Sequence, residues 1–196
     1  MPFCYSPWTN IDISPDGKHL VFDMLGDVYT VPVAGGDAQA LTNDAAWNFQ
    51  PKYSPDGKSI VFVSDRTGGA NIWTMDLASK KLRQISKEKE HQIHNPSWSP
   101  NGQYIAARKS FMGRRSIPGG AIWMYHIAGG TGVEIKPPLD KDQPQKNIAE
   151  PVFSKDGNEL FYSMDATAGK RWQYGKNSSG SIFEIRKTNL TTGKET

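Results

Sequence analysis

Short apolar runs recur along the chain, and each is followed within a few residues by glycine, proline, aspartate or asparagine. Residues 60–63 and 72–75 are examples, because they are rich in β-branched and aromatic side chains and are short enough for strands. No stretch of useful length has the period of an amphipathic helix. The pattern therefore predicts an all-β fold built from many short strands.

One tetrapeptide punctuates this pattern four times. Ser-Pro-Asp-Gly begins at Ser14 and Ser54, returns as Ser-Pro-Asn-Gly at Ser99, and returns again as Ser-Lys-Asp-Gly at Ser154. Proline presets φ, aspartate or asparagine tolerates the next position, and glycine accepts positive φ, so each copy predicts a hairpin turn. The serines are 40, 45 and 55 residues apart. A unit of roughly 40–45 residues is the size of a four-stranded propeller blade.

Four such blades account for the chain, which we interpret as one domain, a β-propeller fragment covering residues 1–196. The predicted blades are about 6–45, 46–90, 91–148 and 149–196. The last unit stops at Thr196, where its fourth strand is expected to begin, so we expect an incomplete ring. Its first and last sheets would then have unpaired edges and open faces. This predicts that the chain associates with itself through those open blade faces.

Composition fits this fold and narrows the functions. The chain has 196 residues, of which 37% are hydrophobic and 22% charged, and its net charge of +3 argues against nucleic acid as a partner. Its single cysteine, Cys4, excludes an internal disulfide. No run approaches the length of a membrane-spanning helix, and the first residues lack the features of a signal peptide.

The repeat resembles that of the TolB-like propeller family, in which an aromatic residue precedes Ser-Pro-Asp-Gly and an apolar strand leads into Ser-Asp-Arg. The second unit carries this resemblance most fully, at residues 53–57, 64–66 and 72–73. The resemblance covers nearly the whole chain. It implies a periplasmic or secreted protein-interaction module of the cell envelope, with any export signal outside this chain.

A narrower resemblance concerns the third and fourth units. Residues 95–100, residues 106–109 and the insertion at 172–174 are similar to large bacterial amidohydrolases related to imidazolonepropionase. Those enzymes carry a TolB-like propeller before a metal-dependent barrel, which implies that this module gates or positions substrate for a catalytic domain of the same parent chain. Their His-x-His motif does not occur here, so no catalytic residue is carried over. The propeller gate of a serine peptidase is a third interpretation.

Two long loops of the third and fourth units are the candidate binding surface. Each joins the second strand of its blade to the third, and loops of this length usually have a role. Their basic and aromatic side chains predict a docking surface for an acidic or aromatic-accepting protein partner, and solvated loop charge is the alternative. The residues are Arg108, Lys109, Phe111, Arg114, Arg115, Lys170, Arg171, Trp172 and Tyr174.

The remaining reactive side chains favour structural roles. His91 and His94 lie three apart, but the only cysteine is remote, which favours a polar blade connection over a zinc site. Carboxylates such as Asp23 and Asp165 recur beside second strands, where hairpin roles are expected. No Gly-x-Ser-x-Gly elbow occurs. We therefore predict no catalytic residue, metal or cofactor in this chain, and the activity of a longer parent protein stays open.

Overall fold

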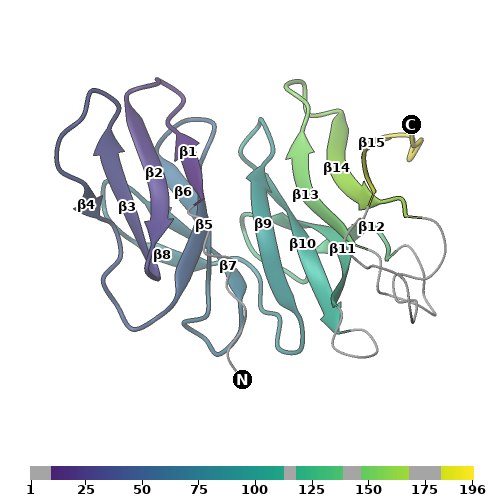
Figure 1. Ribbon diagram of the computed structural model, residues 1–196, viewed down its shortest axis with the longest axis horizontal. Coiled ribbons are helices and arrows are strands. Elements are labelled where there is room, and N and C mark those ends of the chain that lie inside the picture. The colour runs from purple at the N-terminus through teal and green to yellow at the C-terminus, as the bar shows by residue number, and fades with distance from the viewer. Residues whose placement is uncertain (1–9, 113–117, 139–146, 168–181) are drawn as a thin grey trace.

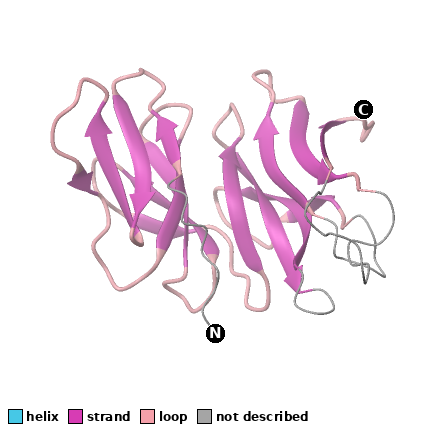
Figure 2. Ribbon diagram, viewed as in Figure 1, coloured by secondary structure: helices cyan, strands magenta, loops and turns pink. Residues whose placement is uncertain are grey.

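The computed structural model describes residues 10–112, 118–138, 147–167 and 182–196, and its regular elements in these ranges are all strands (Figure 2). They form four antiparallel sheets in chain order, which confirms the predicted all-β propeller with four blades (Figure 1). A helix capable of crossing a membrane does not occur among these residues.

The first three blades are four-stranded meanders, and the fourth has three strands. The strands of the first two blades are β1 (Ile11–Ile13), β2 (His19–Met24), β3 (Asp27–Pro32), β4 (Gln39–Ala40), β5 (Asn48–Tyr53), β6 (Ser59–Ser64), β7 (Asn71–Asp76) and β8 (Leu82–Gln84). Those of the last two are β9 (Gln92–Trp98), β10 (Tyr104–Met112), β11 (Pro118–His126), β12 (Val133–Lys136), β13 (Ile148–Phe153), β14 (Glu159–Asp165) and β15 (Phe183–Asn189).

The last three residues occupy the place of a fourth strand in the fourth blade. Glu195 forms an antiparallel bridge with Thr188 of β15. Lys187 and Thr196 exchange two backbone hydrogen bonds of 2.9 and 3.0 Å. The side chain of Glu195 also accepts a hydrogen bond from Tyr162 and pairs with Lys136 of the third blade. The chain end is therefore tied both to its own blade and to the preceding one.

The four repeated tetrapeptides form equivalent turns between the first and second strands. In each copy the serine hydroxyl donates to the third side chain of the tetrapeptide, over distances of 2.6, 2.6, 2.7 and 2.5 Å. The glycine that closes the turn has a φ of 71° at Gly17 and 75° at Gly157, a conformation that glycine accepts without a Cβ clash. These turns set the register of the strands on either side.

Three hydrophobic clusters join successive blades, and all three follow one rule. We call the face that a blade turns toward the following blade its trailing face, and the opposite one its leading face. Val21 and Val28 on the trailing face of the first blade pack against Ile60 and Phe62 on the leading face of the second. Equivalent positions form the other two clusters. Among the described residues, none of these clusters joins the first blade to the fourth.

Candidate functional site

The first strands of all four blades line one cavity of about 500 Å³. We call it the axial cavity, because each blade contributes its β1, β5, β9 or β13 strand. The residue four positions before the turn serine lines it in every blade. These four residues are Asn10, Gln50, Asn95 and Glu150. The repeat therefore delivers one polar side chain from each blade to a shared site.

Three of these four residues adopt an unusual backbone conformation. Gln50, Asn95 and Glu150 have φ values of 56°, 52° and 56°, in a region that side chains other than glycine rarely adopt. Each precedes a buried proline, and the ladder register of its strand shifts there. Proline lacks the backbone donor that a regular ladder needs, so a bulge at this point is expected. Strained residues of this kind cluster at functional sites.

Hydrogen bonds tie the strained residues to the neighbouring blade. Asp23, which is buried, accepts from the backbone N–H of Asn10 at 2.5 Å and of Gln50 at 3.3 Å. The side-chain oxygen of Gln50 in turn accepts from the backbone N–H of Asn95 at 2.7 Å. Asp23 thus links two blades rather than acting only within its own hairpin. The backbone around the cavity is held by these contacts before any ligand binds.

Charges of both signs lie around the axial cavity. Lys52 pairs with Asp12 at 3.6 Å, and Asp12 also accepts the backbone N–H of Tyr53 at 2.9 Å. Glu150 is exposed and, among the described residues, makes no salt bridge. The cavity therefore offers amide groups together with one carboxylate, that of Glu150, which makes no salt bridge in the described part of the chain.

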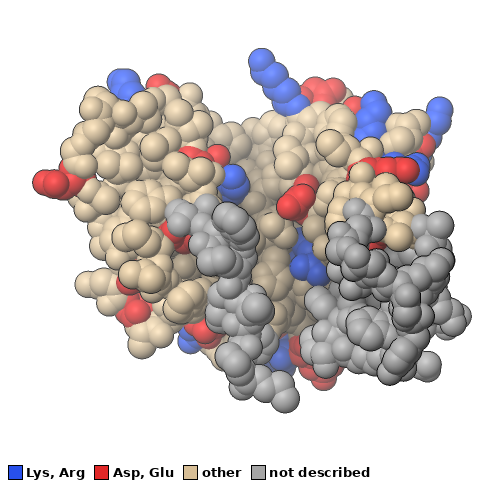
Figure 3. All heavy atoms as spheres, viewed as in Figure 1, with Lys and Arg blue, Asp and Glu red and all other residues tan. Residues whose placement is uncertain are grey.

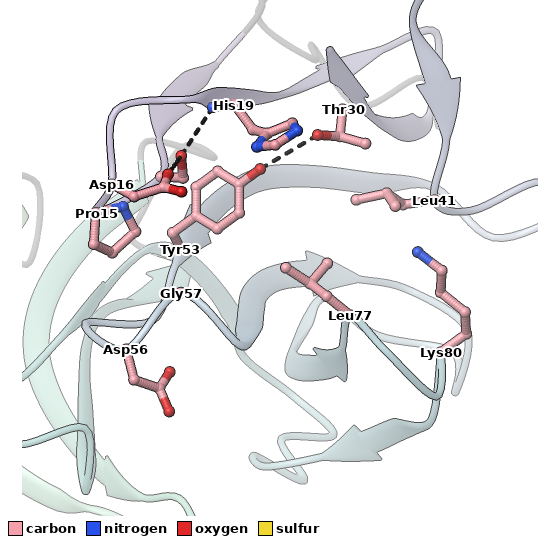
Figure 4. Close-up of a pocket in the computed structure, with 11 residues that line it drawn as sticks. Pro15, Asp16, His19, Thr30, Leu41, Tyr53, Asp56, Gly57, Leu77 and Lys80 are labelled. Atoms are coloured by element: carbon pink, nitrogen blue, oxygen red, sulfur yellow. Dashed lines mark hydrogen bonds between the residues drawn. The ribbon is translucent and has the colours of Figure 1, made fainter. Parts of the chain in front are cut away.

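Besides the axial cavity, two further hollows lie between neighbouring blades, at the tetrapeptide turns. One, of about 380 Å³, is bounded by Asp16, His19 and Thr30 on one side and by Tyr53 and Lys80 on the other (Figure 4). The hydroxyls of Tyr53 and Thr30 are 3.3 Å apart. The next pair of blades has a similar hollow of about 410 Å³. Because this hollow is repeated from blade to blade, we attribute it to blade packing rather than to a dedicated site.

The predicted loop surface is only partly within the described residues. Arg114, Arg115, Lys170, Arg171, Trp172 and Tyr174 lie outside them. Arg108 is half-buried and donates to the carbonyl of Gly119 at 3.5 Å. The ring of Phe111 contacts that of His91 at 4.6 Å between centroids. The prediction of a docking surface on these loops stays a prediction.

The structure places Lys109 away from that predicted surface. Its side chain is buried, its ammonium group lies 2.8 Å from the carboxylate of Glu88 and it sits 4.0 Å over the ring of Trp123. Alternation along β10 turns Lys109 toward the second blade, on the side of Ala107 and away from solvent. Lys109 therefore belongs to the interior between two blades. The run of basic residues in the sequence did not predict this burial.

The two close histidines do not form a ligand pair. His91 contacts Phe111, whereas His94 is largely buried against Phe49, with ring centroids 5.9 Å apart. Burial, and next the charge of Arg108, lowers the pKa of His94 to about 4, so this ring is neutral at pH 7. In the described ranges, no group of three His, Cys, Asp or Glu side chains is placed to hold a metal ion.

Charge is mixed over the described part of the face seen in Figure 3, where basic and acidic side chains alternate among uncharged ones. This distribution matches the small net charge of +3. Nucleic-acid binding depends on a concentrated basic surface. The described surface seen there offers a mixed field instead.

Comparison with known proteins gives relatives that include a TolB protein and a protease subunit. The chain is 27% identical to the Tol-Pal system protein TolB of Francisella tularensis, over 86% of this chain and 47% of that protein. It is 26% identical to a putative Tricorn-like protease C-terminal subunit of Sulfurisphaera tokodaii, over 79% of this chain and 16% of that protein. The structure of a putative TolB from Agrobacterium tumefaciens superposes with a TM-score of 0.72 at 18% identity, covering 97% of this chain and 61% of that one.

The chain corresponds to only part of each of these relatives. It spans about half the length of the TolB relative and less of the protease subunit. The family model of the Tricorn protease N-terminal beta propeller domain matches residues 10–195, which is nearly all of the chain. On this match and on the four blades described above, the chain belongs to the Tricorn protease N-terminal β-propeller domain family.

Proposed function

We propose that the chain is a non-catalytic binding module whose axial cavity receives an extended segment of a protein partner or of a catalytic domain in the same parent chain. The observation that carries this proposal is the set of polar residues that the four first strands bring to one cavity. Three of them stand on strained backbone beside a proline. An extended segment presents backbone N–H and C=O groups, which side-chain amides can bind.

The exposed carboxylate of Glu150 adds a preference to this site. A lysine, arginine or N-terminal amine on the incoming segment would form a charge-assisted hydrogen bond with it. The neighbouring carboxylate of Asp12 is already paired with Lys52. We therefore propose that the module prefers segments carrying a basic group.

The parent protein is proposed from the relatives. One is named as a protein of the Tol-Pal system and another as a Tricorn-like protease subunit. These names favour an envelope interaction module or the propeller of a peptidase, and neither points to an amidohydrolase parent. For the first alternative we propose a location in the cell envelope. The sequence of a longer parent chain would distinguish the two.

The binding proposal is tested with a library of short extended peptides, with and without basic residues, measured against the 196-residue chain. We expect Glu150→Gln to weaken basic peptides about tenfold, since a hydrogen bond to a charged group contributes about 1.5 kcal/mol. The matched control is His19→Ala in the hollow between the first two blades, which should change nothing. If the two variants weaken binding equally, or if only the His19 variant does, the axial cavity is not the site.

A further inference from the structure

The axial cavity has two ends of different chemistry. One end is formed by the polar residues that stand four positions before each turn serine, and the other is lined by Pro15, Pro55 and Trp98, which stand next to the turn serines. On the third blade, the polar Asn95 and the apolar Trp98 are three positions apart along β9. A strand rises about 3.3 Å per residue, so the two ends lie roughly 10 Å apart.

Contacts between neighbouring blades keep equivalent positions of the first strands side by side. Gln50 accepts the backbone N–H of Asn95, and both stand four positions before their turn serine. Lys52 pairs with Asp12 at 3.6 Å, and both stand two positions before it. The indole N–H of Trp98 donates to the carbonyl oxygen of Lys52 at 3.3 Å. The polar end and the apolar end are therefore shared by several blades.

Trp98 is the largest side chain at the apolar end. Because its indole N–H is already bonded to the backbone of the second blade, the ring offers the cavity an apolar surface. Trp98 also packs against the hydrophobic cluster between the second and third blades and is half-buried. These contacts hold the ring before a ligand arrives, so little entropy is lost when an apolar side chain packs on it.

We propose that the axial cavity prefers segments in which an apolar residue stands three positions from a basic one, with the basic group at Glu150 and the apolar side chain on Trp98. This inference rests on the proposed function of the cavity and adds a second contact to it. Glu150 stands four positions before its turn serine and Trp98 one position before its own, a difference of three. An extended segment rises by about the same distance per residue as the strands around it, so the spacing carries over.

The conformation of the bound segment follows from where the two contacts lie. Glu150 is on β13 and Trp98 is on β9, and these two strands are in contact. Both contacts therefore lie toward one side of the segment. A polyproline II helix has about three residues per turn and a rise of about 3.1 Å, which puts residues three apart on one side. A β-strand instead puts residues two apart on one side, so spacing distinguishes the two conformations.

Peptides of one composition test the spacing on the 196-residue chain by calorimetric titration. In one peptide a lysine and a leucine stand three positions apart in a background of alanine and proline, and in a second they stand two apart. A third has alanine in place of the leucine. We expect the first peptide to bind about tenfold more tightly than the third, because it buries a leucine side chain. Equal or tighter binding of the second peptide would overturn the proposal.

Variants of the protein separate this inference from the proposed function. Trp98→Leu should weaken the first peptide about fivefold and leave the third unchanged, whereas Glu150→Gln should weaken both. Trp73→Leu is the matched control, because Trp73 is a half-buried tryptophan of β7 outside the axial cavity. Circular dichroism checks each fold, and the peptide series on the unmodified chain needs no variant.

Two outcomes would count against the inference in different ways. Peptides that bind through Glu150 with no effect of spacing or of Trp98→Leu would overturn the apolar contact and leave the proposed function standing. If no peptide binds, or if Glu150→Gln changes nothing, the proposed function fails and this inference fails with it.

Discussion

The second and third blades are covered on both faces, whereas the first and fourth each leave one face to solvent. The contrast is visible at Ile72 and Ile185, which hold equivalent positions on their third strands and are 0% and 81% exposed. Both blades have the same turn and the same antiparallel order of their first three strands. Burial in this fold is therefore decided between blades, and the sequence of one blade does not specify it.

Ion pairs also differ between the inner blades and the fourth blade. Between the second and third blades, Lys109 pairs with Glu88 inside the protein, and Tyr125 donates to Glu88 at 3.2 Å. Burial, and then the charge of Glu88, raises the pKa of Tyr125 far above its usual value. On β15 of the fourth blade, the Glu184–Arg186 pair is partly exposed and lies on the strand face opposite to Ile185. An exposed pair contributes little to stability, but a buried one is costly to break.

The largest expected effect is at the matched isoleucines. Ile72→Ala should lower the free energy of unfolding by about 2–5 kcal/mol, because it leaves a cavity in the cluster between two blades. Ile185→Ala should lower it by less than about 0.5 kcal/mol in dilute solution, where that side chain already contacts water. Urea denaturation of both variants measures the difference. Equal losses would show that the fourth blade has a covered trailing face in the single chain.

A glycine between the third and fourth blades provides a second, smaller test. A Cβ on Gly120 would lie 2.4 Å from the carbonyl oxygen of Ile148 and 2.7 Å from Nε of Arg108, too close for either contact. Gly120→Ala should therefore cost about 1–3 kcal/mol. Gly69, whose added Cβ would lie 3.4 Å from the carbonyl oxygen of Glu88, is the matched control, and neither glycine has a positive φ.

Thermal unfolding of the two glycine variants gives the readout. We expect a clear fall in Tm for Gly120→Ala and a small change for Gly69→Ala. If Gly120→Ala is as stable as the unmodified protein, the third and fourth blades are less closely packed than described, and the division between inner and terminal blades weakens.

Much of this fold could be predicted from local sequence. Each tetrapeptide specifies its own turn through side chains only two residues apart, at Ser14, Ser54, Ser99 and Ser154. These turns can therefore be predicted from the sequence without tertiary context. The buried state of Lys109 could not be predicted in this way. It depends on which neighbouring blade receives that face of β10, and on Glu88, which is far from Lys109 in sequence.

The axial residues were missed although the sequence holds a signal for them. Gln50-Pro51, Asn95-Pro96 and Glu150-Pro151 recur at one offset before the turn serine. Proline inside a strand marks an edge or a bulge, so this recurrence predicts a repeated bulge. What it does not predict is the convergence of these residues on one cavity, because that convergence depends on how the four sheets are arranged.

The smallest expected effect concerns the turns, where inner and terminal blades should behave alike. The pKa of Asp56 lies below its usual range, because the Ser54 hydroxyl and then the backbone N–H of Lys58 donate to its carboxylate. The pKa of Asp156 in the terminal blade is lowered in the same way by Ser154 and Asn158. A carboxyl whose pKa is lowered by folding stabilises the protein above its unfolded pKa. That contribution is lost as the pH falls through the folded pKa.

Asp56→Asn tests this reasoning, since asparagine already holds the equivalent position at Asn101 and accepts the same serine hydroxyl at 2.7 Å. We expect the variant to unfold a few tenths of a kcal/mol more easily at pH 7, as a charge-assisted hydrogen bond becomes a neutral one at an exposed turn. The difference should shrink as the pH falls below about 4, where the unfolded carboxyl becomes protonated, and vanish only below the lowered pKa of the folded protein. Asp156→Asn should show the same pH dependence, because these bonds lie within the turn and involve no neighbouring blade. Urea unfolding of both variants between neutral and acid pH is the measurement. A pH dependence present in the inner blade and absent in the terminal one would mean that the turns, too, respond to what covers the blade.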